Sequence, residues 1–353
     1  SALLTAVALS IFLYEMIRFG GRMYTRYFTA RMGAGLNLGN TLDATGLRQY
    51  RPDADELEYE VWWGNPRLDR ETFEMIARAG FRTVRIPVTW EEHMDEEGRI
   101  SERWMERVQE VADMALSADL YVIINMHHEE WLDLQIEKEA EIQQRFGFAW
   151  AQIAGRFQDY DERLLFESMN EPRLRDSVYE WTSGTQQMRE MVNRLNELFV
   201  KTVREAGGGN VRRFLLICPY ASTCEEEGMR GLIIPDDTRI IVSIHMYKPY
   251  SFCQKKGGDT DWDTPENREK AASIFSDMND IFVKKGVPVI LTEFGCVDKG
   301  NLEERLTWTE YYMELAGKYH INCIWWDCGE YRLLDRENGM WEFPEMVKIL
   351  WGQ

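Results

Sequence analysis

Short apolar runs alternate along the chain with longer segments of helical periodicity. Several runs lack the strict alternation of a strand with one wet face, which is typical of parallel strands covered on both faces. Eight runs predict strands, at 35–39, 81–87, 120–126, 164–170, 213–219, 240–246, 287–293 and 321–327. Six segments predict helices, at 69–79, 101–117, 149–157, 185–205, 267–285 and 302–318. Gly80 is a suitable C-terminal stop for the first helix, and Ser101 is a suitable N-cap for the second.

This alternation of strands and helices predicts the fold class. Eight strand–helix units in succession are the signature of a (β/α)8 TIM barrel. A doubly wound open sheet usually carries a glycine-rich phosphate loop after its first strand, and no such motif follows Gly33. No Pro- or Ser-rich linker divides the chain. We therefore expect one catalytic barrel over residues 33–353, preceded by an N-terminal helical segment over residues 1–32.

The N-terminal segment contains an apolar run of 13 residues, at 2–14. A membrane-spanning helix needs about 20 such residues, and the run lacks the basic flank of a secretion signal. Three interpretations remain: a targeting remnant, a membrane-surface helix, or a helix packed on the main domain. We expect the third, with Leu4, Val7, Ile11 and Tyr14 on the face that contacts the barrel.

Net charge, tryptophan content and cysteine spacing limit the kinds of substrate and site that the chain can have. The formal net charge is −19, so the surface repels nucleic acids and other polyanions but tolerates a neutral substrate. The 13 Trp residues exceed what a core requires and suit stacking on sugar rings. None of the six cysteines stands in a CxxC pair, so the sequence predicts neither a zinc knuckle nor a disulfide framework.

Polar residues gather where the predicted strands end, which is where barrels place their active sites. Glu171 and Glu293 each close an apolar run, on separate strands. Two such carboxylates suit glycosidic bond cleavage, in which one protonates the leaving oxygen and the other attacks the anomeric carbon or activates water. Their neighbours at other strand ends are Asn37, Arg85, His127, His128, Asn170, His245, Tyr247 and Trp326.

The motifs at these strand ends resemble those of glycoside hydrolase family 5, the cellulase family. They occur in the family's order from residue 35 to residue 327, and the resemblance is closest to the bacterial endo-β-1,4-glucanase branch. The matching segments are GLNLGNTLDA, WWGNP, VRIPVTW, NMHHEEW, LLFESMNEPR, VSIHMYKPY, ILTEFG and IWWD.

The resemblance implies a role for each matched residue. Glu171 matches the general acid/base, Glu293 the nucleophile, and Arg85 the arginine that supports the ionised nucleophile. The implied reaction is double displacement with retention, for which the two carboxyl groups must lie about 5–5.5 Å apart.

Other matched positions imply contacts with the sugar. Asn170 matches the amide that binds the 2-hydroxyl, His127 a histidine that lines the cleaved-sugar subsite, and Trp326 the platform under the sugar. His245 and Tyr247 match the pair beside the two glutamates. Contacts with more distant sugars are expected from Asn37, His128, Trp63 and Trp131.

The resulting prediction is an endo-acting enzyme for a β-1,4-linked glucan polysaccharide or oligosaccharide, without cofactor, metal or membrane span. We expect a secreted monomer, with a cytoplasmic oligosaccharidase as the alternative. Alternative activities are a β-mannanase, an exo-acting β-glucosidase, a non-catalytic carbohydrate-binding barrel and a metal-dependent hydrolase. Against the last, His127 and His128 are adjacent, and neighbouring strand residues point to opposite sides.

Overall fold

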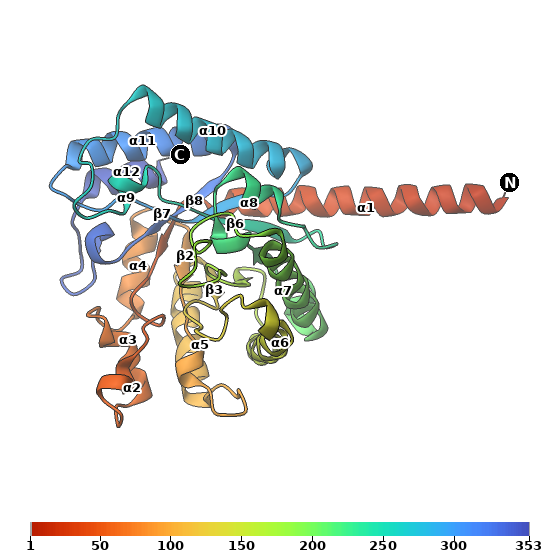
Figure 1. Cartoon of the computed structure of the whole chain (residues 1–353), viewed down its shortest axis with the longest axis horizontal. Coiled ribbons are helices and arrows are strands. Elements are labelled where there is room, and N and C mark those ends of the chain that lie inside the picture. The colour runs from red at the N-terminus through yellow and green to blue at the C-terminus, as the bar shows by residue number, and fades with distance from the viewer. Residues whose placement is uncertain (1, 353) are drawn as a thin grey trace.

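A closed barrel of eight parallel strands, hydrogen-bonded in sequence order, forms the centre of the molecule (Figure 1). The computed structural model describes residues 2–352 and, at the N-terminus, the side chains of residue 7 and of residue 9 onward. Each predicted apolar run contains one strand, so the TIM-barrel prediction is confirmed. The strands are β1 (Gly35–Asn37), β2 (Thr83–Ile86), β3 (Tyr121–Asn125), β4 (Leu164–Glu167), β5 (Leu215–Ile217), β6 (Ile240–Met246), β7 (Val289–Phe294) and β8 (Asn322–Trp326).

Helices cover the outside of the barrel, one in each connection between consecutive strands and one after β8. These are α4 (Arg70–Arg78), α5 (Glu102–Ser117), α6 (Glu139–Arg156), α7 (Gln186–Glu205), α8 (Glu226–Arg230), α10 (Pro265–Ile281), α11 (Leu302–Tyr319) and α12 (Pro344–Trp351). Shorter elements lie in the loops, namely α2 (Leu47–Tyr50), α3 (Tyr59–Trp62), α9 (Tyr250–Cys253) and the hairpin of β9 (Leu334–Asp335) and β10 (Met340–Trp341).

One predicted helix start was wrong, and one correctly placed N-cap residue does not cap its helix with its side chain. Helix α6 begins ten residues before the predicted start, because Ile142, Phe146 and Trp150 continue one buried stripe through Gly147. Ser101 occupies the N-cap position of α5, but its hydroxyl donates to Glu56 Oε1 (2.8 Å) instead of capping the helix.

The core has two parts. The larger part fills the space between the strands and the surrounding helices. The smaller part lies inside the barrel toward the N-terminal ends of the strands, where the ring of Phe28 stacks on Phe214 with centroids 3.8 Å apart. Its members are Phe28, Met32, Tyr121, Ile123, Leu165, Phe214, Leu216, Ile241, Ile290 and Ile324.

The last turns of helix α1 (Ala2–Met32) close the bottom of the barrel. Thr25 Oγ1 donates to the carbonyl of Thr238 (2.7 Å), and Asn322 Nδ2 donates to the carbonyl of Thr29 (2.6 Å). The fixed point of α1 is therefore its C-terminal end, which leads directly into β1.

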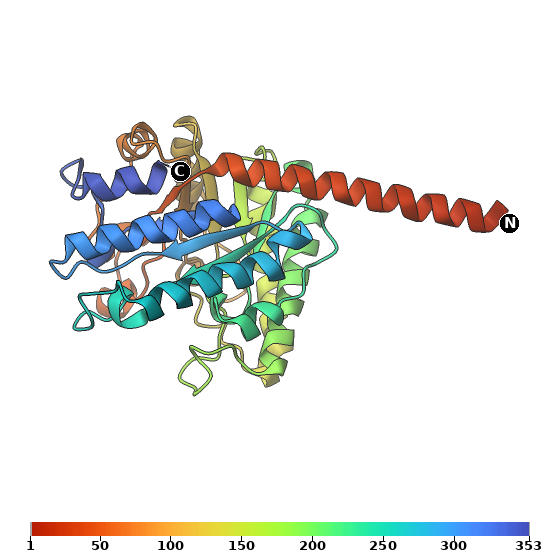
Figure 2. The ribbon, with the colours of Figure 1, turned by 90° about the horizontal axis from the view of Figure 1, so that it is seen from above.

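The N-terminal part of α1 projects away from the barrel as a continuous helix in both views (Figures 1 and 2). The expectation that this segment packs on the main domain is wrong for Val7 and Ile11, which are 49% and 57% exposed. Tyr14 does contact the main domain, because its Oη donates to Asp236 Oδ2 (2.9 Å), although Tyr14 is still 46% exposed. The side chain of Leu4 lies outside the described residues. Only the C-terminal half of the helix finds a surface to cover, and no turn folds the first half back. No helix within residues 2–352 combines the length and apolar composition needed to cross a membrane.

Substituting Phe28 tests the role of α1 as the floor of the barrel. Phe28→Ala removes a ring that is 3% exposed, and we expect the free energy of unfolding to fall by about 3–5 kcal/mol. Urea denaturation followed by circular dichroism measures the change. The matched control is Tyr27→Ala, because Tyr27 is the preceding residue and is 60% exposed. Its free energy of unfolding should stay within about 0.5 kcal/mol of the wild-type value. A loss below about 1 kcal/mol for Phe28→Ala would contradict this role.

Candidate active site

A cavity of about 690 Å³ opens at the C-terminal ends of the strands. Eight of the twelve residues predicted from the sequence line it, so the topology does bring these strand ends together. They are His127, His128, Asn170, Glu171, His245, Tyr247, Glu293 and Trp326.

A break in the strand register positions two of these residues side by side. Between β6 and β7, Ile244 pairs with Leu291 but the next residue, His245, pairs with Glu293, so Thr292 is an extra residue on β7. A bulge of this kind re-aims the side chains that follow it. Glu293 and His245 consequently become cross-strand neighbours at the mouth of the barrel.

Arg85, on β2, is fully buried beneath the cavity and connects four neighbours. Its Nε donates to Glu167 Oε2 and its Nη1 to Glu293 Oε1, both at 2.7 Å. Nη1 also donates to Asn37 Oδ1 and Nη2 to Asn170 Oδ1, both at 2.9 Å. Burial alone would lower the pKa of Arg85, but the charges of Glu167 and Glu293 raise it. The guanidinium is therefore a fixed cation that orients four polar groups.

The two predicted catalytic carboxylates face each other across the cavity. A carboxylate oxygen of Glu171, one of Glu293 and a ring nitrogen of His245 all lie within 4.8 Å of one another. Glu293 also accepts a hydrogen bond from Tyr247 Oη (2.9 Å), so two donors from different strands solvate its charge. An oxygen–oxygen separation of no more than 4.8 Å is closer to the about 5–5.5 Å between the carboxyl groups of retaining glycosidases than to the about 6.5–9.5 Å of inverting ones.

Glu171 and His245 are joined by a hydrogen bond, and the pKa shifts of the two groups indicate which one carries the proton. His245 Nδ1 lies 2.8 Å from Glu171 Oε1 and 3.5 Å from Glu293 Oε2. Burial would raise the pKa of Glu171, but the hydrogen bond and charge of His245 hold it below the ordinary value. Burial would lower the pKa of His245, but the charge of Glu293 and the hydrogen bond to Glu171 raise it. In the free enzyme we therefore place the proton on His245 Nδ1.

The hydrogen bonds of Asn125 fix the tautomer of His127. Asn125 Oδ1 accepts from the backbone N–H of Val88 (3.1 Å), so its Nδ2 is the donor to Glu167 Oε2 (3.1 Å) and to His127 Nδ1 (3.0 Å). Burial holds the pKa of His127 well below its usual value, so the ring is neutral. A neutral ring that accepts at Nδ1 carries its proton on Nε2. That N–H can donate to a ligand hydroxyl.

The amide of Asn170 also presents a donor to the cavity. Its Oδ1 accepts from Arg85 Nη2 (2.9 Å), which leaves the NH2 group for a ligand.

Trp326 forms an aromatic wall at the end of β8, and its position depends on Gly39. A Cβ at Gly39 would lie 2.5 Å from the indole ring, so only glycine permits this approach. The indole plane is parallel to the ring of His127 to within 2°, with centroids 6.0 Å apart.

Four predicted site residues do not line the cavity. Asn37 is buried and donates from Nδ2 to the carbonyl of Thr292 (2.7 Å), while its Oδ1 accepts from Arg85, so it supports the site and does not reach a ligand. Arg85 is likewise enclosed. Trp131 donates to Glu129 Oε2 (3.2 Å) and stands beneath Arg145. Trp63 is 37% exposed and lies beside His128, with ring centroids 5.8 Å apart.

Sequence reasoning missed two fully buried supporting residues, Glu167 and Asn125. Glu167 is hydrogen-bonded to Arg85, and Asn125 is hydrogen-bonded to His127. Besides Arg85 and Asn125, Glu167 bonds Ser243 Oγ (2.6 Å), so both of its oxygens are occupied. The available signal was a lone carboxylate inside an apolar strand, which is rarely buried unless it is paired.

Two groups of residues within the described part of the chain have the donor set for a cation. One is Glu171, His245 and Glu293, and the other is Asp43, His127 and His128. The expectation that His127 and His128 point apart does not hold, because β3 ends at Asn125 and the chain turns beyond it. However, the two oxygens of Asp43 accept from the backbone N–H groups of Thr41 (2.7 Å) and Asn40 (3.1 Å), and His127 Nδ1 is already paired. This second group is a poor fit to an ion.

The chain is similar in sequence to a glycoside hydrolase family and to several bacterial endoglucanases. The family model described as Cellulase (glycosyl hydrolase family 5) matches residues 47–332. Endoglucanase A of Clostridium longisporum is 37% identical over 330 residues, which are 90% of this chain and 64% of that protein. Endoglucanase B of Ruminococcus albus is 39% identical, over 91% of this chain and 78% of that protein. The chain thus spans just under two thirds of the first relative.

Solved structures agree in fold over nearly the whole chain. A GH5-4 broad specificity endoglucanase from Ruminococcus champanellensis with bound cellotriose superposes with a TM-score of 0.88 at 36% identity, covering 92% of this chain and 97% of that one. A xyloglucan-specific endo-β-1,4-glucanase from a metagenomic library, in complex with cellotriose, gives 0.89 at 34% identity, covering 94% and 99%.

The protonation states of the three cavity histidines can be tested by NMR. Burial lowers the pKa of His128 to about 4 and that of His127 well below 6.5, so both should remain neutral from pH 5 to pH 8. His245 should instead keep its proton above pH 6.5, because its pKa is raised. Long-range 1H–15N spectra, assigned with single His→Asn variants, report charge and tautomer together. Titration of His128 near pH 6.5, or a proton on Nδ1 of His127, would contradict this electrostatic account.

Proposed function

This chain belongs to glycosyl hydrolase family 5, the cellulase family, and we propose that it hydrolyses β-1,4-linked glucans with retention of anomeric configuration. The observation that carries this proposal is the pair Glu171 and Glu293, whose oxygens lie within 4.8 Å of each other and whose partners differ. Glu293 accepts a hydrogen bond from the permanent cation Arg85 at 2.7 Å, whereas the hydrogen-bond partner of Glu171 is His245, which holds a transferable proton. Arg173, the permanent cation beside Glu171, is farther away, at 3.8 Å.

In the first step, Glu293 Oε attacks the anomeric carbon while Glu171 protonates the departing glycosidic oxygen. The C–O bond to the leaving sugar breaks as the ester bond to Glu293 forms. The ester is neutral, and the negative charge moves to Glu171, which has given its proton to the leaving oxygen. Arg85 and Tyr247 donate to Glu293 from below and beside it, and they keep it from rotating away from this line of attack.

In the second step, Glu171 takes a proton from water, and the resulting oxygen nucleophile attacks the anomeric carbon from the side the leaving group vacated. The ester to Glu293 breaks and both carboxyl groups return to their starting states. Two inversions give net retention.

Glu171 must carry the proton when the first step begins, and His245 supplies it. Moving the proton across the 2.8 Å hydrogen bond from Nδ1 to Oε1 converts an ion pair into a neutral pair. Sugar binding removes water from this region, which favours the neutral pair because separated charges are costly in a dry site.

Charge and aromatic lining support a neutral glucan as substrate. A chain of net charge −19 offers no attraction to a polyanion, and Trp326 offers a flat face to a β-linked pyranose. The similar proteins are named as endoglucanases, a xyloglucan-specific endo-β-1,4-glucanase and a lichenase, so we propose endo action on cellulose, mixed-linkage glucan or xyloglucan. Such polymers lie outside cells, and we infer an extracellular site of action. The cavity opens at the end of a closed barrel formed by a single chain, and we propose that the protein acts as a monomer.

Variants of the two carboxylates test catalysis against simple binding. We expect Glu171→Gln to lower kcat on barley β-glucan by about 10²–10⁴-fold, and Glu293→Gln to lower it further, because no nucleophile remains. Reducing-sugar assays on carboxymethylcellulose, β-glucan, xyloglucan and mannan measure activity and preference together. Circular dichroism checks that each variant folds.

Added azide distinguishes the acid/base role proposed for Glu171 from the nucleophile role proposed for Glu293. It should rescue Glu171→Ala through a β-glycosyl azide, because the small anion replaces water on the covalent intermediate. For Glu293→Ala it should give an α-glycosyl azide by direct displacement. Activity on mannan alone would overturn the glucan assignment, and unchanged activity in both glutamine variants would overturn the catalytic one.

Trp326 is expected to determine substrate affinity more than bond cleavage. Trp326→Ala removes the stacking face, and KM for cellotetraose should rise about tenfold, equivalent to about 1.4 kcal/mol. Trp351→Ala is the control, because that indole is 46% exposed on α12, outside the cavity. An unchanged KM in Trp326→Ala would show that the sugar does not stack there.

A further inference from the structure

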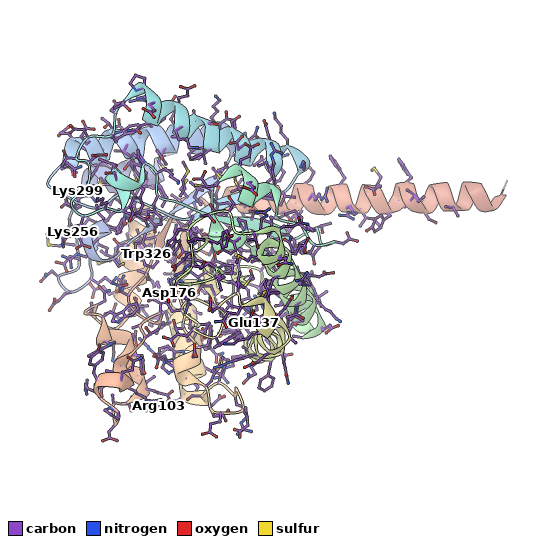
Figure 3. All side chains as sticks on the ribbon, viewed as in Figure 1. Arg103, Glu137, Asp176, Lys256, Lys299 and Trp326 are labelled. Atoms are coloured by element: carbon purple, nitrogen blue, oxygen red, sulfur yellow. The ribbon has the colours of Figure 1, made fainter. Side chains whose placement is uncertain are left out.

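The first half of α1 presents an apolar surface that no other part of the described chain covers. We call residues 7–19 the apolar arm. Its large apolar side chains are each between 46% and 73% exposed, and side chains project from both sides of the arm in Figure 3. The arm also makes polar contacts with the barrel, since Tyr14 Oη donates to Asp236 Oδ2 (2.9 Å) and Arg18 pairs with the same carboxylate. They are Val7, Leu9, Ile11, Phe12, Leu13, Tyr14, Met16, Ile17 and Phe19. The only charged residues in the arm are Glu15 and Arg18.

The apolar residues surround the arm on all sides. Successive residues of a helix are rotated by about 100°, so the consecutive run from Ile11 to Tyr14 alone covers most of the circumference. A protein partner packed against one face would leave the opposite face in water. A helix that is apolar all round belongs either inside a protein core or in lipid. The arm therefore fits a surrounding apolar medium better than a single docking face.

The apolar arm is long enough to reach well into lipid. Its thirteen residues of helix extend about 20 Å, compared with about 30 Å for the hydrocarbon core of a bilayer. Within residues 2–352 no helix is long and apolar enough to cross a membrane.

Cations gather where the arm meets the barrel. A groove of about 540 Å³ at this junction is lined by Arg22, Arg230 and Lys285 and otherwise by apolar residues, with no carboxylate. Arg230 is paired with Glu226 (2.7 Å), and Arg18 of the arm is paired with Asp236. Among the described residues, Arg22 and Lys285 are therefore the groove cations without an ion pair. Phosphate headgroups of an anionic lipid surface complement these two charges.

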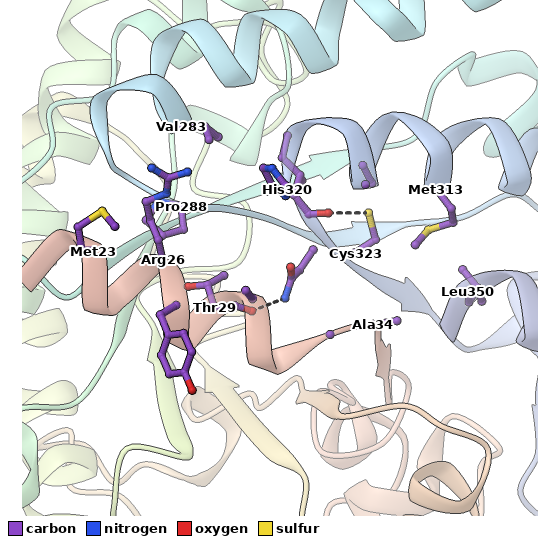
Figure 4. A pocket seen from close by; sticks show the side chains of 17 residues that line it. Met23, Arg26, Thr29, Ala34, Val283, Pro288, Met313, His320, Cys323 and Leu350 are labelled. Atoms are coloured by element: carbon purple, nitrogen blue, oxygen red, sulfur yellow. Dashed lines mark hydrogen bonds between the residues drawn. The ribbon is translucent and has the colours of Figure 1, made fainter. Parts of the chain in front are cut away.

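A second cavity continues the apolar surface on the other side of the junction. It measures about 550 Å³, and Met23, Val283, Met313 and Leu350 contribute to its lining, with Arg26 beside them (Figure 4). An acyl chain with an anionic headgroup matches this combination of apolar walls and one arginine.

Both junction cavities involve the bottom of the barrel, since α1 closes that end and leads into β1. The catalytic cavity opens at the C-terminal ends of the strands, which is the opposite end. We propose that the apolar arm inserts into an anionic phospholipid bilayer and docks the barrel by its bottom, so that the catalytic cavity faces away from the lipid. This proposal is independent of the reaction catalysed.

Vesicle flotation with the full chain tests the proposal. The vesicles contain equal parts of phosphatidylcholine and phosphatidylglycerol, with pure phosphatidylcholine as the comparison. We expect the wild type to float with the anionic vesicles. Phe12→Glu/Ile17→Glu should bind them at least about tenfold more weakly, because two charges enter the inserted surface. The matched control, Ile136→Glu/Met340→Glu, adds the same charges at exposed apolar sites outside the arm and should float like the wild type.

A charge-reversal variant tests the junction separately. Arg22→Glu/Lys285→Glu should weaken binding to anionic vesicles and reduce its dependence on salt. Hydrolysis of soluble cellotetraose should be the same in all of these variants, which confirms that each one folds. Absence of flotation, or equal flotation of Phe12→Glu/Ile17→Glu, would overturn the proposal. Dimers that form without lipid and dissociate in that variant would instead identify a second copy as the occupant.

Discussion

The buried guanidinium of Arg85 is the interaction on which the site depends. It joins β1, β2, β4 and β7 through Asn37, Glu167, Asn170 and Glu293, and none of these five side chains is more than 6% exposed. A buried charge is tolerated only when it is paired and hydrogen-bonded, and removing one partner typically costs about 3–5 kcal/mol. The same bonds that satisfy the cation hold Glu293, the proposed nucleophile, and the amide of Asn170 in place. Stability and catalytic geometry are therefore coupled at this residue.

Two local features of the backbone, the extra residue at Thr292 and the glycine at Gly39, also position side chains of the site. A regular β7 would direct Glu293 elsewhere, because strand side chains alternate between two faces. The extra residue at Thr292 changes that alternation, and its carbonyl accepts the hydrogen bond that anchors Asn37. Gly39 similarly makes space for Trp326. The barrel is regular below the site and irregular at its mouth, where side chains must converge.

The sequence predicted the barrel and the meeting of Glu171 and Glu293 in one cavity, because both leave strong local signals. Apolar runs mark the strands, and polar motifs mark their carboxyl ends. The supporting residues were harder to predict, because a motif identifies a residue without showing which way it faces. Asn37 was expected to bind sugar but turns inward to Arg85, whereas Glu167 was overlooked inside an apolar strand. The apolar run at 2–14 looked like a packed helix, since its periodicity cannot show whether the fold offers a surface to receive it.

Covalent trapping tests the central claim most directly. A 2-deoxy-2-fluoro-β-cellobiosyl fluoride slows both steps of a retaining reaction, but its good leaving group lets the first step outpace the second. The account predicts that the protein gains the mass of one fluorocellobiosyl group and that peptide mapping places it on Glu293. A label on any other residue, or no label on an enzyme that still hydrolyses glucan, would contradict the account.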